Sequence, residues 1–203
     1  MSKFNYREMD WIAMFIIVLM LLTAYFFLKN SSQFGLKCII SNADGKKYCI
    51  RDRKRLQEAT SLLALLRDNS QQVVESIYKE HGDDSFVKRL KERFNPSTFQ
   101  ETLPTSIHTA YSENKGERMA FCLNKKKNNN EELIDKNTLM FVALHELTHI
   151  GTQDIGHTDT YWSNFKFVLE HAVKERFYIP VDYKTNPAPY CGMTISDNPY
   201  YDL

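Results

Sequence analysis

The sequence has almost no net charge, because 26 lysine and arginine residues balance 25 aspartate and glutamate residues among 203. This balance argues against a general nucleic-acid-binding surface, so nucleic acid is not expected as a partner. The four cysteines show no C-x-x-C spacing and therefore do not indicate a metal site of their own. Internal repeats are absent too. Beyond an apolar N-terminal segment, about 170 residues remain, enough for one domain with a hydrophobic core.

Two short segments depart from this even composition. The first is a basic cluster made of Lys46, Lys47, Arg51, Arg53, Lys54 and Arg55. We expect a solvated strand end and helix start there, with contact to phosphates or acidic lipid headgroups as the alternative. The second is the run of three lysines and three asparagines at residues 125–130, which predicts an exposed loop.

An apolar run without a charged residue covers residues 11–28. A helix of this length rises about 27 Å, close to the thickness of a bilayer's hydrocarbon core. Trp11 and Lys29 suit the two interfaces, so the run predicts a single transmembrane helix that contacts the lipid bilayer, after an N-terminal flank of residues 1–10. A cleaved signal peptide fits less well, because the run is longer than the usual ~7 to 15 apolar residues and no A-x-A-like site follows.

The orientation of such a helix follows from the lysines beside it. Lys37, Lys46 and Lys47 join Lys29 after the run, and fewer basic residues precede it. This bias favours a cytosolic C-terminal domain in a single-pass membrane protein. The sequence Asn95-Pro96-Ser97 contains the proline that prevents N-glycosylation, in mild agreement with a cytosolic domain.

The cysteines leave the redox compartment open. Cys38 and Cys49 flank a hairpin turn signal at residues 42–45 and can face each other across two strands, or they can be reduced core residues. Cys122 and Cys191 can form another pair.

The most informative motif is His145-Glu146-Leu147-Thr148-His149, an H-E-x-x-H sequence within the apolar segment 140–150. Residues four apart lie on the same face of a helix, so both imidazoles can bind one zinc ion while Glu146 reaches the water bound to it. The segment is apolar on most sides, as in a helix at the centre of a domain. Two buried imidazoles without partners would each cost about 1 to 3 kcal/mol, which favours a metal site over two ordinary core histidines.

Catalytic zinc usually has a third protein ligand, and two residues compete for this role. His157 follows the motif through a short segment whose glycines, at 151 and 156, can end the helix and reverse the chain. Glu170 lies on the following helix, at about the separation at which thermolysin-like enzymes place a glutamate ligand. We prefer His157 because its short tether restricts where it can lie. Glu170 is then a partner of a ligand or a surface charge.

Further candidates around this site are weaker. Asp154 and Asp159 could also bind metal, although Asp159 or Thr158 more simply caps the next helix. A donor for the developing oxyanion could come from one of three tyrosines in the following segment, Tyr161, Tyr183 and Tyr190. In such a site Glu146 is the general base, and peptide hydrolysis is the natural reaction.

The motif and its surroundings resemble a known family. Residues 141–149, followed by Gly156-His157 and Tyr161-Trp162, are similar to the WLM and SprT-like zinc peptidases, and the similarity covers about residues 105–175. The resemblance implies zinc bound by His145, His149 and His157. The gap between His149 and His157 differs from the metzincin spacing, so no Met-turn is assumed.

Two other segments, residues 111–116 and 190–193, look most like the WLM-like proteins of large DNA viruses. The resemblance therefore implies a viral zinc metallopeptidase, in a host or virion membrane, that hydrolyses a protein or peptide substrate. The ubiquitin-, SUMO- and DNA-binding tails of the cellular DNA-repair relatives are missing, so their substrates do not carry over. The alternative is a non-catalytic zincin-fold protein with a structural or assembly role in a membrane or virion.

The expected fold class is α+β, with a zincin-like domain at residues 29–203 in which the H-E-x-x-H helix packs on a short antiparallel sheet. Within it we expect a hairpin and helical part at 37–104, a catalytic core at 105–175 and a C-terminal tail at 176–203. The helix predicted at 53–80 is interrupted near residues 68–70. Strands are expected at 105–112 and 118–123, and 119–123 is the candidate edge strand for binding substrate.

Overall fold

The computed structural model describes residues 6–127 and 129–202, and it describes their side chains except at 6–10, 27–34 and 129–131. The chain divides into two compact units with the boundary between Gly35 and Leu36. The first unit contains helix α1 (Tyr6–Phe34). The second unit contains, in chain order, β1 (Leu36–Ile40), β2 (Lys47–Arg51), α2 (Leu56–His81), α3 (Ser85–Arg93), η1 (Pro96–Thr98), β3 (Phe99–Glu101), β4 (Ala110–Glu113), β5 (Arg118–Phe121), β6 (Asn124–Lys126), β7 (Asn129–Leu133), α4 (Lys136–Gly151), α5 (Asp159–Lys174), β8 (Ala188–Tyr190), β9 (Met193–Ile195) and η2 (Pro199–Tyr201).

The predicted transmembrane helix at residues 11–28 is not supported. In the part of the chain that the structure describes, no helix combines the length and the apolar character needed to cross a membrane. The single-pass membrane localisation, with its cytosolic domain, depended on that helix and is corrected with it.

The main sheet of the second unit is mixed, with strand order β1-β2-β3-β5-β4. β1 and β2 form the predicted antiparallel hairpin, with Cys38 opposite Cys49, and these cysteines form a disulfide. β3 pairs in parallel with both β2 and β5, so the prediction of a purely antiparallel sheet was wrong. The reason is that α2 and α3 form a crossover between β2 and β3, and such a connection returns the chain in the parallel direction.

This strand order also corrects the edge strand. β5 contains most of the predicted edge segment 119–123, but it lies between β3 and β4 and is therefore internal. β4 occupies the edge instead. Its backbone pairs with β5 on one side only, so the backbone groups on its other side are not paired within this sheet.

Two local predictions also need correction. Helix α2 runs without interruption through residues 68–70, because this stretch contains neither glycine nor proline and Gln72 donates a hydrogen bond to Asp68 one turn earlier at 3.0 Å. Of the loop expected at 125–130, residues 125–126 belong to β6 and residues 129–130 to β7, which pair with each other, and residue 128 lies outside the described residues. The short helix α3 ends before Asn95-Pro96, and Asp84 caps its first turn.

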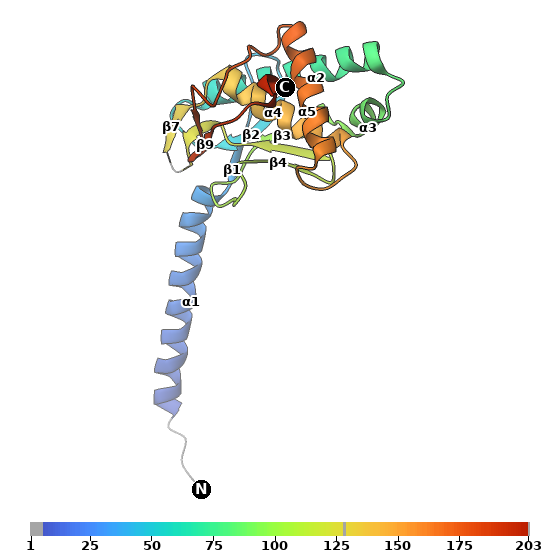
Figure 1. Cartoon of the computed structure of the whole chain (residues 1–203). Coiled ribbons are helices and arrows are strands. Elements are labelled where there is room, and N and C mark those ends of the chain that lie inside the picture. The colour runs from blue at the N-terminus through green and yellow to red at the C-terminus, as the bar shows by residue number, and fades with distance from the viewer. Residues whose placement is uncertain (1–5, 128, 203) are drawn as a thin grey trace. The chain divides into compact units, whose positions relative to one another are not determined.

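Helix α4 is the central element of the second unit, and it packs against α2, α3, α5 and β4 (Figure 1). Its side chains are buried on nearly all sides, as its sequence predicted. Asp135 caps its first turn by accepting a hydrogen bond from the Thr138 N–H. At the other end Gly151 lies against Phe86 of α3, and a Cβ at this position would come within 2.5 Å of the Phe86 ring. The site residues are therefore placed on a helix that its neighbours hold from several directions.

Part of the basic cluster is buried rather than solvated. Arg51 and Arg53 form ion pairs with Glu101, which is itself fully buried on β3. The Arg51 guanidinium also donates hydrogen bonds to the carbonyl oxygens of Thr102 and Lys127, and Arg53 donates to Asn124. These contacts join β2, β3 and the start of β6. The pairing of charges from distant segments explains why a local sequence pattern could not identify them as buried.

The charge of Glu101 is expected to contribute strongly to stability. Glu101→Gln keeps the shape but leaves two arginines without a counter-charge, so we expect the free energy of unfolding to fall by about 3 kcal/mol. Urea denaturation of the full chain measures this change. Glu58→Gln removes an equivalent partner from the exposed Arg55–Glu58 pair and is expected to change stability by less than about 1 kcal/mol. Equal effects of the two substitutions would contradict the prediction.

Candidate metal centre

Three histidines converge at the C-terminal half of α4. The Nε2 atoms of His145, His149 and His157 lie 3.1 to 3.2 Å from one another. His145 and His149 stand one turn apart on α4, as the H-E-x-x-H spacing predicted. His157 reaches them from the connection to α5. The three residues form a group whose ligand atoms could hold one metal ion.

The chemistry of this donor set fits a zinc ion. Ligand nitrogens at the usual ~2.0 to 2.1 Å from a tetrahedral zinc ion lie about 3.3 Å apart, close to the distances seen here. Three imidazole nitrogens cannot satisfy one another by hydrogen bonds alone, because at least one pair must bring two lone pairs or two N–H groups together. Burial lowers the pKa of His145 to about 3 and that of His149 to about 4, so both imidazoles are neutral, the form that binds metal.

The connection that carries His157 is held in place by its backbone. Gly156 has a φ of +85°, a conformation that favours glycine, and it turns the chain immediately before His157. Thr158 then caps α5 by accepting a hydrogen bond from the Tyr161 N–H at 3.3 Å. This assigns the capping role to Thr158 rather than Asp159. Turn and cap together fix the position of His157 relative to α4.

Lys115, in the turn between β4 and β5, supports the same connection. Its Nζ donates hydrogen bonds to the carbonyl oxygens of His149, Thr152 and Asp154 at 3.2, 2.8 and 3.0 Å. A single ammonium group thus binds the end of α4 and the start of the segment that leads to His157. Charged donors also interact favourably with the carbonyl groups at a helix C-terminus.

We therefore expect Lys115→Met to weaken zinc binding although Lys115 touches none of the three imidazoles. Loss of an outer partner of a metal ligand typically weakens affinity by about 10- to 100-fold, and we expect a value near the lower end. Competition with a chromogenic chelator measures it. Lys88→Met, at an exposed lysine of α3, is the matched control and should leave the affinity unchanged. An unchanged affinity in Lys115→Met would exclude this positioning role.

Aromatic side chains of α5 set the orientation of the imidazoles. The Tyr161 ring stacks on His149 with centroids 4.3 Å apart, and Trp162 stacks on His157 at 5.3 Å. The Tyr161 hydroxyl donates a hydrogen bond to the His145 carbonyl at 3.2 Å. The two stacking contacts account for the aromatic pair that follows the third histidine in the sequence. The hydrogen bond shows that the Tyr161 hydroxyl is already engaged by the backbone.

Glu146 lies between the histidines in sequence but points into a different environment. Its side chain is 7% exposed, and the backbone N–H of Ser112 on β4 hydrogen-bonds to its carboxyl group. Burial raises the pKa of Glu146 to about 7, although the Ser112 hydrogen bond opposes this shift. A carboxyl group of this pKa can both accept and return a proton near neutral pH.

The other predicted residues lie outside the group of three histidines. Glu170 is exposed on α5, and Asp154 and Asp159 are exposed as well. Tyr183 packs against Phe141, with ring centroids 5.0 Å apart. The charge of Glu146 adds to burial in raising the pKa of both Tyr161 and Tyr190. The Tyr190 hydroxyl donates a hydrogen bond to the Thr109 carbonyl at 3.0 Å.

Sequence reasoning missed Lys115 and Ser112 as site residues. A signal was present, because both lie in the segment 111–116 that carries part of the family resemblance. Their role depends on the turn between β4 and β5 lying beside α4, which the sequence does not show. The pairing of Cys122 with Cys191, left open by the sequence, is present as a disulfide.

Glu80, His81 and His171 form another group of potential metal ligands in the described part of the chain. The Lys174 ammonium group lies 2.6 Å from Glu80, where a bound cation would compete with it. His171 is buried and hydrogen-bonds to Ser76. We therefore interpret this group as an ion-pair cluster that joins α2 to α5.

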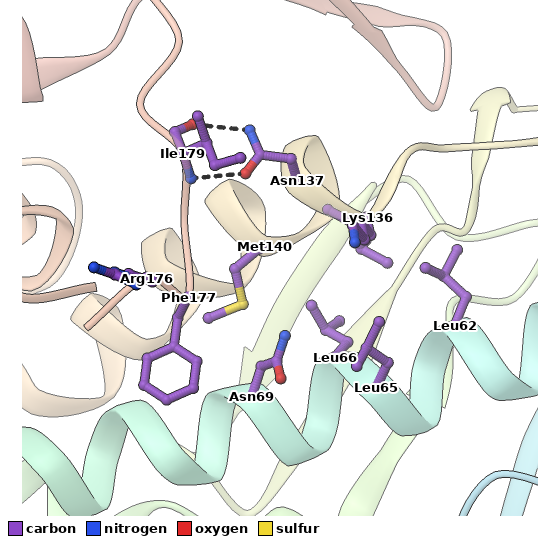
Figure 2. A pocket seen from close by; sticks show the side chains of 11 residues that line it. Leu62, Leu65, Leu66, Asn69, Lys136, Asn137, Met140, Arg176, Phe177 and Ile179 are labelled. Carbon is purple, nitrogen blue, oxygen red and sulfur yellow. Dashed lines mark hydrogen bonds between the residues drawn. The ribbon is translucent and has the colours of Figure 1, made fainter. Parts of the chain in front are cut away.

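A cavity of about 190 Å³ lies between α2, the first turns of α4 and the segment after α5 (Figure 2). Leu62, Leu66 and Met140 line it, and the Asn137 side chain exchanges two hydrogen bonds with the backbone of Ile179 at its rim. Neither the three histidines nor Glu146 lines this cavity. It is therefore separate from the candidate metal centre.

Comparison with known proteins shows that the chain is similar in sequence to proteins of several viruses. The chain is 25% identical over 187 residues to an uncharacterized protein of Acanthamoeba polyphaga mimivirus, covering 90% of this chain and 93% of the relative. Uncharacterized proteins of Invertebrate iridescent virus 3 and Invertebrate iridescent virus 6 are 50% identical over 46 residues and 39% identical over 51 residues. These shorter similarities cover 23% and 25% of this chain and 29% of each relative. No protein-family model matches the chain, and no solved structure matches it.

Proposed function

We propose that this protein is a zinc-dependent metallopeptidase of the WLM and SprT-like kind, with zinc on His145, His149 and His157 and Glu146 as general base. The observation that carries the proposal is the convergence of three imidazole Nε2 atoms within 3.2 Å, one residue away from a buried carboxyl group. Histidines that only filled the core would not need to aim the same nitrogen at one point. The viral relatives agree with the resemblance to WLM-like proteins of large DNA viruses. They are uncharacterized and give no information on activity.

The chemistry expected from the site divides between the metal and the protein. A bound zinc ion lowers the pKa of a coordinated water to near 7 and polarises a carbonyl group. Glu146 accepts a proton at its carboxylate and later delivers it to the nitrogen of the leaving amine. Because Glu146 is held by the Ser112 N–H, its carboxyl group keeps one orientation while the proton moves.

The neighbouring sheet edge supports an extended peptide as substrate. The carbonyl oxygen of Thr109, immediately before β4, accepts a hydrogen bond from the N–H of Cys122, immediately after β5. Backbone groups alternate between the two sides of a strand, so the N–H and C=O of the next residue, Ala110, face the open edge. Ala110 also lines a cavity that contains His145 and Glu146. A peptide added to β4 would therefore lie with its backbone beside both residues.

Metal analysis of the purified full chain and digestion of an unbiased peptide library test this function. We expect one zinc ion per chain and cleavage that a chelator abolishes and added zinc restores. Zinc at one ion per chain without cleavage of any peptide would reject the peptidase. That outcome would support the alternative, a protein that keeps the metal site for assembly or binding.

A further inference from the structure

A second feature of the site is an apolar cavity of about 270 Å³ on the Glu146 side of the histidines. His145 and Glu146 line it, whereas His149 and His157 do not. This volume lies slightly below the ~300 to 1,000 Å³ of typical small-molecule sites, so the cavity suits one large side chain.

The walls of the cavity are mainly apolar. Phe141 and Val142 of α4, Trp162 and Phe165 of α5 and Ile195 of β9 contribute to its lining. These residues come from distant parts of the chain, and most of them are buried, so the cavity has a defined shape. Such a surface favours apolar groups, which leave water on entering it.

Two polar groups around the cavity already have partners. Asp197 lies 3.1 Å from the Lys184 ammonium group, which it shares with Asp202. The Tyr190 hydroxyl is bonded to the Thr109 carbonyl. An acidic substrate side chain would therefore lose its hydration in the cavity without gaining an opposite charge.

The C-terminal side of the cavity is fixed by a covalent link. Tyr190, Met193 and Ile195 of the β8–β9 hairpin line it, and Cys191 in the turn of that hairpin forms a disulfide with Cys122. Backbone hydrogen bonds from Cys191 and Gly192 to the carbonyls of Asn124 and Lys125 hold the hairpin as well. The disulfide and these hydrogen bonds thus fix the hairpin as one wall of the cavity.

We propose that this cavity binds a large apolar side chain, such as leucine or phenylalanine, on the residue that supplies the amine of the cleaved peptide bond. The inference rests on the proposed peptidase function. Glu146 delivers its proton to that amine nitrogen, and the side chain of the same residue is attached one atom away. Because Glu146 also lines the cavity, this side chain is the one that enters it.

The test uses the zinc-loaded full chain and a peptide series that differs at this one position. We expect kcat/KM for leucine or phenylalanine to exceed that for alanine or aspartate by at least about 10-fold, because pockets of this kind discriminate by about 10- to 200-fold per methylene group. Ile195→Asp places a carboxylate in the wall, and it should remove this preference and favour lysine. Ile179→Asp makes the same change at the other cavity (Figure 2) and should leave the preference as it is.

A binding measurement provides a readout that does not depend on turnover. Trp162 lines the cavity, so its fluorescence should respond when a short peptide with an N-terminal phenylalanine binds to zinc-loaded Glu146→Gln. The same peptide beginning with alanine should bind at least about 10-fold more weakly. Ile195→Asp in this background should remove the difference.

The outcomes separate the inference from the function on which it rests. Metal-dependent cleavage without a preference at this position, or a preference that Ile195→Asp does not change, would overturn the cavity's role and leave the peptidase intact. Absence of metal-dependent cleavage with every peptide would overturn the peptidase, and the inference would fall with it.

Discussion

Glu146→Gln is expected to retain zinc and to reduce peptide hydrolysis by at least about 10³-fold. The amide has the size of the carboxyl group and can still accept the hydrogen bond from the Ser112 N–H, so the surroundings should not change. It cannot accept a proton, and general-base catalysis typically contributes about 10²- to 10⁴-fold. Initial cleavage rates of the best library peptide, together with the zinc content, measure both parts of the prediction.

The matched control for this variant is Glu170→Gln, which makes the same change at an exposed glutamate of α5. It should keep both zinc and activity. Wild-type activity in Glu146→Gln would reject Glu146 as the base. Loss of zinc from Glu146→Gln would instead show that this side chain supports the metal centre.

His157→Ala is expected to weaken zinc binding by about 10³-fold and to abolish hydrolysis as a result. Structural zinc sites gain about 10 to 16 kcal/mol from all their ligands, so the loss of one of three is expected to cost about 4 kcal/mol. His157 is exposed and lies on a connection, so its removal should leave the core and the unfolding midpoint nearly unchanged. Zinc content after dialysis against a buffered zinc concentration gives the affinity.

Two controls separate this result from general effects. Glu170→Ala tests the competing ligand, and zinc loss in that variant with full zinc in His157→Ala would transfer the third position to Glu170. His81→Ala removes a histidine of the other potential ligand group, and we expect no zinc loss there. Zinc loss from His81→Ala instead would show that the Glu80, His81 and His171 group holds metal.

The candidate site could be predicted largely from local sequence. His145 and His149 are four residues apart, and helical geometry alone places them on one face. The connection to His157 is short and turns at Gly156, so the sequence restricted where that histidine could lie. The competing Glu170 is separated from the motif by most of α5, and local spacing could not decide its position.

The prediction of the sheet was less successful because strand order is a nonlocal property. β3 contains only Phe99–Glu101, too short for a recognisable alternation of apolar and polar residues, yet it separates β2 from β5 and makes the sheet mixed. Without β3, the sequence pattern predicts an edge strand at residues 119–123. The edge strand that packs against α4 is β4, which overlaps the strand predicted at 105–112, but its place depended on how all the other strands were ordered.

The burial of Arg51 and Arg53 was missed for a similar reason. Their partner Glu101 lies about fifty residues further along the chain, in the strand that the sequence did not reveal. Charged residues without a visible partner are expected at the surface, because burying an unpaired charge is costly. The prediction of a transmembrane helix was wrong for a different reason. An uncharged run shows apolar character, but the described helix does not meet the requirement for crossing a membrane.

By itself, the sequence determined the central buried helix, the pair of histidines on one of its faces and the glutamate beside them, because these follow from helical periodicity. The tertiary structure alone decided which further residues complete the site. It placed Lys115 on the connection to His157, the Ser112 N–H on Glu146 and the β8–β9 hairpin against the apolar cavity. Each of these contacts joins segments far apart in the chain, and only the packing of the whole domain brings such segments together.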